Sequence, residues 1–212
     1  MCSTSPDAGR DGVPTPASPF LGWRIWNLAA GQLESWTVTY RWVPGENVAR
    51  CLVSNSHACA SSPGGRCQCG FWALWAPTQC VYLASAPTEP PWQVMGLISA
   101  WGNVVVHGRE GFRAERAAVL CLFTDRPWSA TAVLGAPSRR GLPRSPTEPP
   151  SQGAVHEADQ RNAIRGVAAR HGVPLVSLRG AVALGLLSEL GVPMEQIEAA
   201  ARLGAIASAD PS

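Results

Sequence analysis

The chain contains no lysine, because all 17 of its basic residues are arginine. Lysine Schiff-base chemistry and the lysine of a phosphate-binding P-loop are therefore excluded. Long apolar runs are also missing: the most hydrophobic stretch, GAVALGLLSELGV, contains Glu189 and is shorter than the roughly 20 residues that a membrane helix needs. The first residues lack the apolar core of a signal peptide. We therefore expect a cytoplasmic protein with reduced thiols and no membrane contact.

Charge is also scarce, with 15% charged residues and a formal net charge of only +2. So small an excess of positive charge does not indicate nucleic acid or an acidic membrane surface as a partner. The chain has no G-x-S-x-G, G-x-G-x-x-G or Walker motif, which removes the common sequence signs of hydrolases and nucleotide-binding proteins. Its nine tryptophans are many for 212 residues and indicate an aromatic core.

Two segments rich in proline, serine and glycine divide the chain. Residues 1–19 show no periodic apolar pattern and are predicted to be disordered, and residues 135–153 contain five prolines and are predicted to form an extended linker. Residues 20–134 then form a predicted β-rich domain, and residues 154–212 a predicted helical module. The expected fold class is α+β: a Trp-rich, mainly antiparallel β domain with a zinc clip, then the linker and a small helical C-terminal module.

Alternation of β-branched and aromatic residues with polar ones predicts the strands. GWRIWNL and SWTVTYRWV are joined by the turn AAGQ, and FWALW and CVYLA are short strand candidates. WQVMGLISAWGNVVVHG and GFRAERAAVLCLF are expected to pair through the glycine-flanked turn HGREGF. RAERAAVLCLF could alternatively begin as a helix, since Ala, Glu and Arg favour one.

The segment after the linker carries helical periodicity, with Ala163, Ile164, Val167 and Ala168 on one face. It predicts a bundle of three helices. The pattern of residues 160–190 also resembles a helix-turn-helix. Its second helix, however, has only Ser177 and Arg179 as polar or basic side chains that could contact a base edge. From residue 151 to the end, five arginines face six acids, so packing or partner binding is favoured over DNA reading.

The sharpest signal is the stretch CLVSNSHACASSPGGRCQCGFWALW, which starts at Cys51. Clustered cysteines in a protein with reduced thiols indicate metal ligands or redox groups rather than disulfides. A structural zinc ion takes four cysteine or histidine ligands in a tetrahedron. We therefore predict a zinc clip made by Cys51, His57, Cys67 and Cys69, with nearby glycines allowing the sharp turn that Cys67 and Cys69 require.

Other interpretations of the same stretch stay open. Cys59 with a neighbouring thiol, or the Cys-x-Cys pair, could form a redox site, or the thiols could be unrelated. Cys59 or Cys80 could also replace a predicted ligand. We expect any zinc to be structural, because no Asp or Glu lies between Asn47 and Glu89 to serve as the base that a catalytic zinc needs.

The chain also carries three motifs: GWRIW, a Cys and His followed by CQCGFWA, and WGNVVVHGREGFRAERA. Together they resemble an uncharacterised family from actinobacteria and other GC-rich bacteria, over residues 22–118. The resemblance implies that Cys51, His57, Cys67 and Cys69 belong together, and it implies no activity. Cys59 stands where the family pattern has proline, and the helical C-terminal part lies outside the resemblance.

A second candidate site lies around the HGREGF turn. A general base could be formed by His107 with a carboxylate such as Glu115, and Arg109 and Arg113 could hold an anion. A solvated hairpin tip with a salt bridge explains the same residues, since the sequence supplies no nucleophile beside them.

These observations favour a non-enzymatic, zinc-stabilised binding or adaptor protein whose helical tail associates with a protein partner or a second copy. The apolar run VPLVSLRGAVALGLL supports that role for the tail, because so small a bundle would expose it. One alternative is a nucleic-acid-binding protein that uses an aromatic β surface and arginines. Another is an enzyme centred on His107 and Glu115.

Overall fold

The structure is a computed structural model. It describes residues 19–36, 38–51, 59, 61–64, 67–83, 92–125 and 152–208. In these residues the fold is mixed α+β, with a mostly antiparallel sheet of seven strands and helices toward the C-terminus, as the sequence predicts. The predicted disordered segment 1–19 and the predicted linker 135–153 lie outside the described residues, except for residues 19, 152 and 153.

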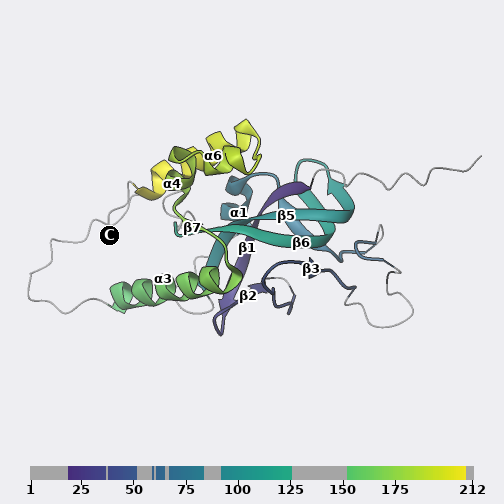
Figure 1. Ribbon diagram of the computed structural model, residues 1–212, viewed down its shortest axis with the longest axis horizontal. Coiled ribbons are helices and arrows are strands. Elements are labelled where there is room, and N and C mark those ends of the chain that lie inside the picture. The colour runs from purple at the N-terminus through teal and green to yellow at the C-terminus, as the bar shows by residue number, and fades with distance from the viewer. Residues whose placement is uncertain are drawn as a thin grey trace, which may run out of the picture.

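Three long strands form the body of the sheet, and four short strands complete it (Figure 1). β1 pairs with β5 along one whole edge, and β5 pairs with β6 through the predicted hairpin. β7 is the exception to the antiparallel order, because it pairs with β6 in parallel. The strands are β1 (Phe20–Ala29), β2 (Gln32–Ser35), β3 (Asn47–Val48), β4 (Phe71–Leu74), β5 (Trp92–His107), β6 (Gly111–Phe123) and β7 (Leu175–Val176).

The long strands curl until the sheet closes on itself. β4 pairs with β6 and also with β1, so β1, β5, β6 and β4 form a ring. Register shifts in β5 permit this curvature, as bulges commonly do. The ring is narrow at Gly22, where a Cβ would lie 2.5 Å from Ala73 Cβ and 2.8 Å from the Phe112 ring. Only glycine fits this close approach of β1 to β4 without a shift of the neighbouring atoms.

Two strand predictions are wrong, and tertiary packing explains both. Beyond Ser35, the described part of the predicted strand SWTVTYRWV is irregular, with one isolated bridge to β2. Its Trp42 nevertheless fills the core, with its ring edge-on to Trp26 at 5.4 Å. The described part of CVYLA, residues 80–83, belongs to helix α1 (Pro77–Leu83), which buries Cys80 and Val81. The helical alternative for RAERAAVLCLF is also wrong, since this segment lies in β6.

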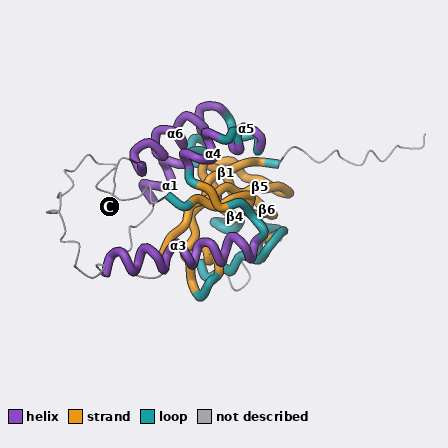
Figure 2. Tube along the Cα trace, turned by 60° about the vertical axis from the view of Figure 1, so that its left-hand side comes forward, coloured by secondary structure: helices purple, strands orange, loops and turns teal. Residues whose placement is uncertain are grey.

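Helices cover both faces of the sheet, so the molecule has three layers (Figure 2). Helix α3 (Gln152–His171) packs Ile164 and Val167 against a core that includes Trp26 and Leu122. The opposite core includes Trp23 and Phe123, and it is covered by α1 and three C-terminal helices. These are α4 (Leu178–Ala183), α5 (Leu186–Glu189) and α6 (Met194–Ser208).

The C-terminal segment is therefore part of the sheet's two cores, in contrast to the predicted module with its own three-helix bundle. α3 lies on one side of the sheet and α4–α6 on the other (Figures 1 and 2). A hydrogen bond of 2.9 Å from Trp23 Nε1 to Gln196 Oε1 ties β1 to α6. The apolar run VPLVSLRGAVALGLL contributes Leu178, Ala181 and Leu187 to the core under these helices. Packing against the sheet thus accounts for these three residues of the run, whereas Leu184 within it is exposed.

The helix-turn-helix interpretation of residues 160–190 also fails. After α3 the chain does not turn directly into a second helix, because β7 comes between and pairs with β6. Ser177, one of the two candidate base contacts, accepts a hydrogen bond of 2.9 Å from Gly180 N and caps the six-residue helix α4. Among the described residues, no helix combines the length and the hydropathy needed to cross a membrane.

Candidate metal centre

Four cysteine side chains converge beside the sheet. The Sγ atoms of Cys51, Cys59, Cys67 and Cys69 all lie within 4.8 Å of one another. Cys51 Sγ is 3.6 Å from Cys67 Sγ, and Cys69 Sγ is 3.8 Å from Cys59 Sγ. Four sulfurs at about 2.3 Å from one zinc ion would be about 3.8 Å apart, so the cluster has the size of a tetrahedral site. None of these four cysteines forms a disulfide within the described residues, so each keeps a thiol that could bind an ion.

The cluster contains three of the four predicted ligands. Cys51, Cys67 and Cys69 come together, whereas His57 lies outside the described residues. Cys59, which the sequence analysis gave only as a possible replacement ligand or redox partner, lies beside them as a fourth thiol. Its position had a signal in the sequence, since Cys51, Cys59 and Cys67 follow one another at intervals of eight residues. Cys80 is not part of the group, because it lies on α1 and its side chain is buried in the core.

Short strands on both sides position the cysteines. Cys51 lies shortly after β3. Between them, Ala49 N donates a backbone hydrogen bond of 2.7 Å to Glu115 O on β6. Cys67 and Cys69 lead directly into β4. Between them and Cys59, the Gly64 N–H donates to Cys69 Sγ at 3.2 Å, and Gly64 O accepts from Cys67 N at 3.2 Å. Backbone N–H bonds to sulfur are the outer-shell contacts that orient metal ligands.

Gly64 is the tightest point of the loop. A Cβ at this position would lie 2.3 Å from Cys59 Sγ and 3.0 Å from Cys59 Cβ. Gly64→Ala is therefore expected to displace Cys59 and weaken zinc binding about tenfold or more, a typical effect of overpacking. Competition with a chromophoric chelator measures this affinity. Gly166→Ala is the matched control, because nothing lies within 4 Å of its Cβ on α3, and its zinc affinity should equal that of the parent.

Arg113 on β6 anchors the loop to the sheet. Its side chain is buried, at 2% exposed, and its Nη1 donates to the carbonyl oxygens of Cys67 and, at 2.9 Å, of Cys69. Its Nε donates to His107 Nε2 at 2.7 Å, and its guanidinium lies 5.3 Å from the centre of the Trp72 ring. In the described part of the chain, no carboxylate forms an ion pair with it. A zinc ion with four thiolates carries a net charge of −2, which suits this buried cation.

The thiols influence one another's ionisation. The pKa of Cys59 is raised to about 12, first because its charged form loses hydration and then because it lies beside the other three sulfurs. The pKa of Cys69 is lowered: burial opposes this shift, but hydrogen bonds to its sulfur, including that from Gly64 N, outweigh it. Thiols this close cannot all carry a charge without a cation among them. A bound dication removes that obstacle, because a coordinating thiol is deprotonated by the metal.

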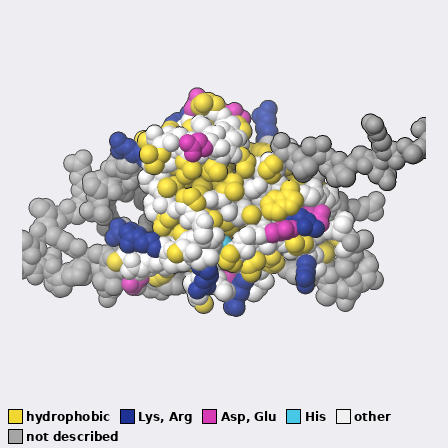
Figure 3. Space-filling view, in the orientation of Figure 1, with side chains coloured by type: hydrophobic (Ala, Val, Ile, Leu, Met, Phe, Trp, Pro, Cys, Tyr) yellow, Lys and Arg dark blue, Asp and Glu magenta, His cyan; other side chains and the backbone are white. Residues whose placement is uncertain are grey.

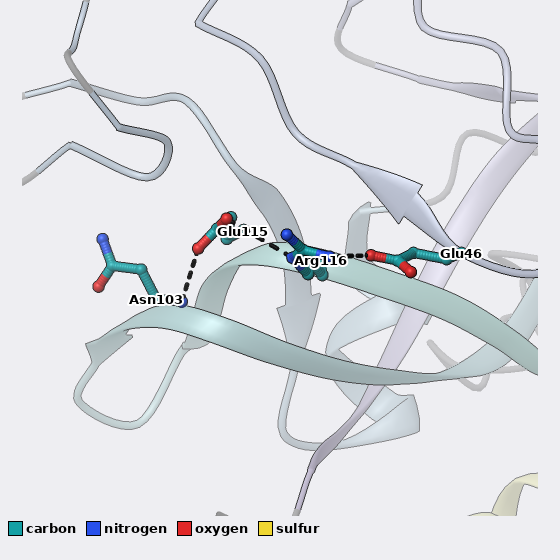
Figure 4. Close-up of polar contacts among 4 residues, drawn as sticks. All are labelled: Glu46, Asn103, Glu115 and Arg116. Carbon is teal, nitrogen blue, oxygen red and sulfur yellow. Dashed lines mark hydrogen bonds and ion pairs between the residues drawn. The ribbon is translucent and has the colours of Figure 1, made fainter. Parts of the chain in front are cut away.

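The second candidate site, at the β5–β6 hairpin, does not assemble. His107 stacks on Trp72 with ring centres 4.5 Å apart, and its Nε2 is occupied by Arg113. Glu115 instead accepts a hydrogen bond of 3.1 Å from Asn103 N and forms an ion pair with Arg116 (Figure 4). Within the described residues, no hydrogen bond or ion pair joins His107 to Glu115. This pair therefore has no geometry for a general base.

The comparisons with known proteins add no relative. No family model, no curated protein and no solved structure matches this chain. The function is therefore argued from the chain's own residues.

Proposed function

We propose that this chain is a non-enzymatic binding protein whose sheet is braced by one structural zinc ion. The ion is held by Cys51, Cys59, Cys67 and Cys69. The observation that carries the proposal is the separation of the four Sγ atoms, all within 4.8 Å of one another, in a loop anchored by a buried arginine. Thiolate ligands select zinc, copper(I) or iron–sulfur centres, and a tetrahedron of four sulfurs is typical of zinc or iron–sulfur sites. Sulfurs this close together leave room for a single ion.

The ligand set supports a structural role for this zinc. Four thiolates fill its coordination sphere, whereas a catalytic zinc keeps one position open for water or substrate. The stretch from residue 47 to residue 88 contains no Asp or Glu that could act as a base beside the ion. The metal would instead tie together the end of β3, the loop around Gly64 and the start of β4.

The nucleic-acid alternative has less support. The large aromatic side chains of Trp23, Trp26 and Trp42 are buried, so they are not available to stack on bases. Arg24 and Arg113 are buried as well. On the face that Figure 3 shows, the basic side chains of the described residues are scattered and form no continuous stripe that could follow a phosphate backbone.

Zinc content tests the proposal. Full-length protein purified without added metal is expected to contain about one zinc per chain by elemental analysis. Removal of the zinc with a chelator is expected to lower the melting temperature by about 10 °C or more, because the folded state loses its bound ion. A metal-free preparation that melts at the same temperature as the untreated protein would overturn the proposal.

A further inference from the structure

β1 has a gap along one edge. On that edge, β4 pairs with β1 only at Trp23. The pairing of β1 with β2 starts only at Trp26 of β1. Arg24 lies in the gap, where its Nη1 donates to Trp72 O on β4 and its Nη2 donates to Ser35 Oγ on β2 at 2.8 Å. The guanidinium thus spans the space between two strands that flank β1 at different points.

A pocket of about 760 Å³ opens at this gap. Its volume falls within the range of small-molecule binding sites, about 300–1,000 Å³. Trp36 and Leu83 are 40% and 44% exposed, so part of its apolar lining faces solvent. Cys67 and Cys69 also line the pocket, which places it beside the candidate metal centre. The large apolar and aromatic residues of the lining include Trp36, Val38, Tyr40, Phe71, Trp72 and Leu83.

The charge of Arg24 has no counter-ion in the described residues. The side chain lines the pocket but is only 7% exposed, and no carboxylate forms an ion pair with it. A guanidinium has five N–H donors, and here only two neutral acceptors are engaged, while Nε has no partner. The ring of Trp42, centred 5.0 Å away, offsets part of the charge. A buried cation without a counter-ion, on a residue that lines a pocket, favours the binding of an anion there.

A second arginine adds positive charge at the same pocket. Arg50 lines it and is exposed to solvent, so its guanidinium can reach an entering ligand. Its charge also acts on Tyr40: burial raises the pKa of the phenol, and the nearby Arg50 partly counters that rise. The three acids of the described ion pairs, Glu34, Glu46 and Glu115, are absent from the pocket lining, so no carboxylate there opposes the two arginines.

We propose that this pocket binds an organic carboxylate with an apolar body, with the carboxylate held by Arg24 and Arg50 and the body packed against the aromatic lining. The inference rests on the proposed binding function and names the ligand class for it. The planar fork of a guanidinium matches a carboxylate and can bind it through two hydrogen bonds. The apolar walls disfavour a strongly hydrated dianion, since burying such a charge is costly.

Calorimetric titration of the zinc-loaded, full-length protein tests the ligand class with two matched pairs of probes. Decanoate is compared with decanol, and 2-naphthoate with 2-naphthylmethanol. At least one acid is expected to bind about tenfold or more tightly than its alcohol, because only the acid forms charge-assisted hydrogen bonds. Preference for decanoate would point to fatty acids and preference for 2-naphthoate to aromatic acids, and either supports the proposal.

Arg24→Gln is the obvious variant, but it also breaks the contacts to Trp72 and Ser35 and could prevent folding. Arg50→Gln avoids this, and it is expected to weaken binding of the acid about threefold to tenfold without affecting the alcohol. Arg41→Gln is the matched control: it removes the same charge from an exposed arginine outside the pocket and should leave acid binding unchanged. Leu83→Trp adds bulk to the lining and should weaken binding of both acid and alcohol.

Equal binding of acid and alcohol, or no saturable binding of either acid at millimolar concentration, would overturn the proposal. An equal effect of Arg50→Gln and Arg41→Gln would show that the acid does not bind at this pocket. Zinc is measured on the same samples, so the two proposals fail separately. Acid binding by protein that holds no zinc would overturn only the proposed zinc site. Bound zinc without acid binding would overturn only the proposed carboxylate ligand.

Discussion

Cys67→Ser is expected to abolish stoichiometric zinc binding and to lower the free energy of unfolding by several kcal/mol. Structural zinc sites supply on the order of 10 kcal/mol of binding free energy in small domains, and that free energy contributes to folding. The serine hydroxyl does not replace a thiolate as a zinc ligand. Elemental analysis gives the zinc content of the variant, and urea unfolding gives its stability.

Cys121→Ala is the matched control for this variant. Cys121 is fully buried on β6 and is not part of the four-cysteine cluster. The control is expected to lose about 1 kcal/mol from the cavity that it creates but to keep one zinc per chain. If Cys67→Ser retains its zinc, or if both variants lose it equally, the assignment of Cys67 as a ligand is wrong.

A chain truncated after residue 151 is expected to lose cooperative unfolding altogether. Truncation removes α3 from one face of the sheet and α4–α6 from the other. It would uncover Trp23 and Phe123, whose rings stack at 5.4 Å. Full burial of one large aromatic side chain stabilises by about 4–5 kcal/mol, and a whole domain has only about 5–15 kcal/mol of stability. Near-ultraviolet circular dichroism and urea unfolding measure the effect.

The control for truncation keeps all the helices and replaces residues 135–151 by a Gly–Ser sequence of equal length. It is expected to unfold cooperatively at the same urea concentration as the parent, because the predicted linker supplies length and not packing. A truncated chain with the parent's cooperative transition would instead show that the sheet folds alone, as the sequence by itself suggested.

The strands that sequence predicted well are those in which alternation is long. β1, β5 and β6 carry enough alternating residues to distinguish a strand from a helix, and the glycine-flanked turn between β5 and β6 fixes their pairing. CVYLA was too short for periodicity to decide, and its burial in α1 depends on a neighbouring helix, α6. The apolar face of α3 was visible in the sequence. The placement of α3 and α6 on opposite faces of the sheet depended on tertiary packing that a pattern does not contain.

The candidate site shows the same limit. Residue types and clustering were enough to predict a metal centre with Cys51, Cys67 and Cys69. They did not decide between His57 and Cys59, since zinc accepts either side chain as its fourth ligand. The burial of the Arg24 and Arg113 side chains gave no sequence signal, because arginine is usually exposed. Both became visible only through the backbone carbonyls and rings that surround them.

X-ray absorption at the zinc edge of the full-length protein tests the central claim most directly, because it identifies the atoms bound to the metal. Four sulfurs at about 2.3 Å, with no nitrogen at about 2.0 Å, are expected if Cys51, Cys59, Cys67 and Cys69 hold the ion. A first shell of three sulfurs and one nitrogen would contradict the four-cysteine site and would point to His57 as a ligand.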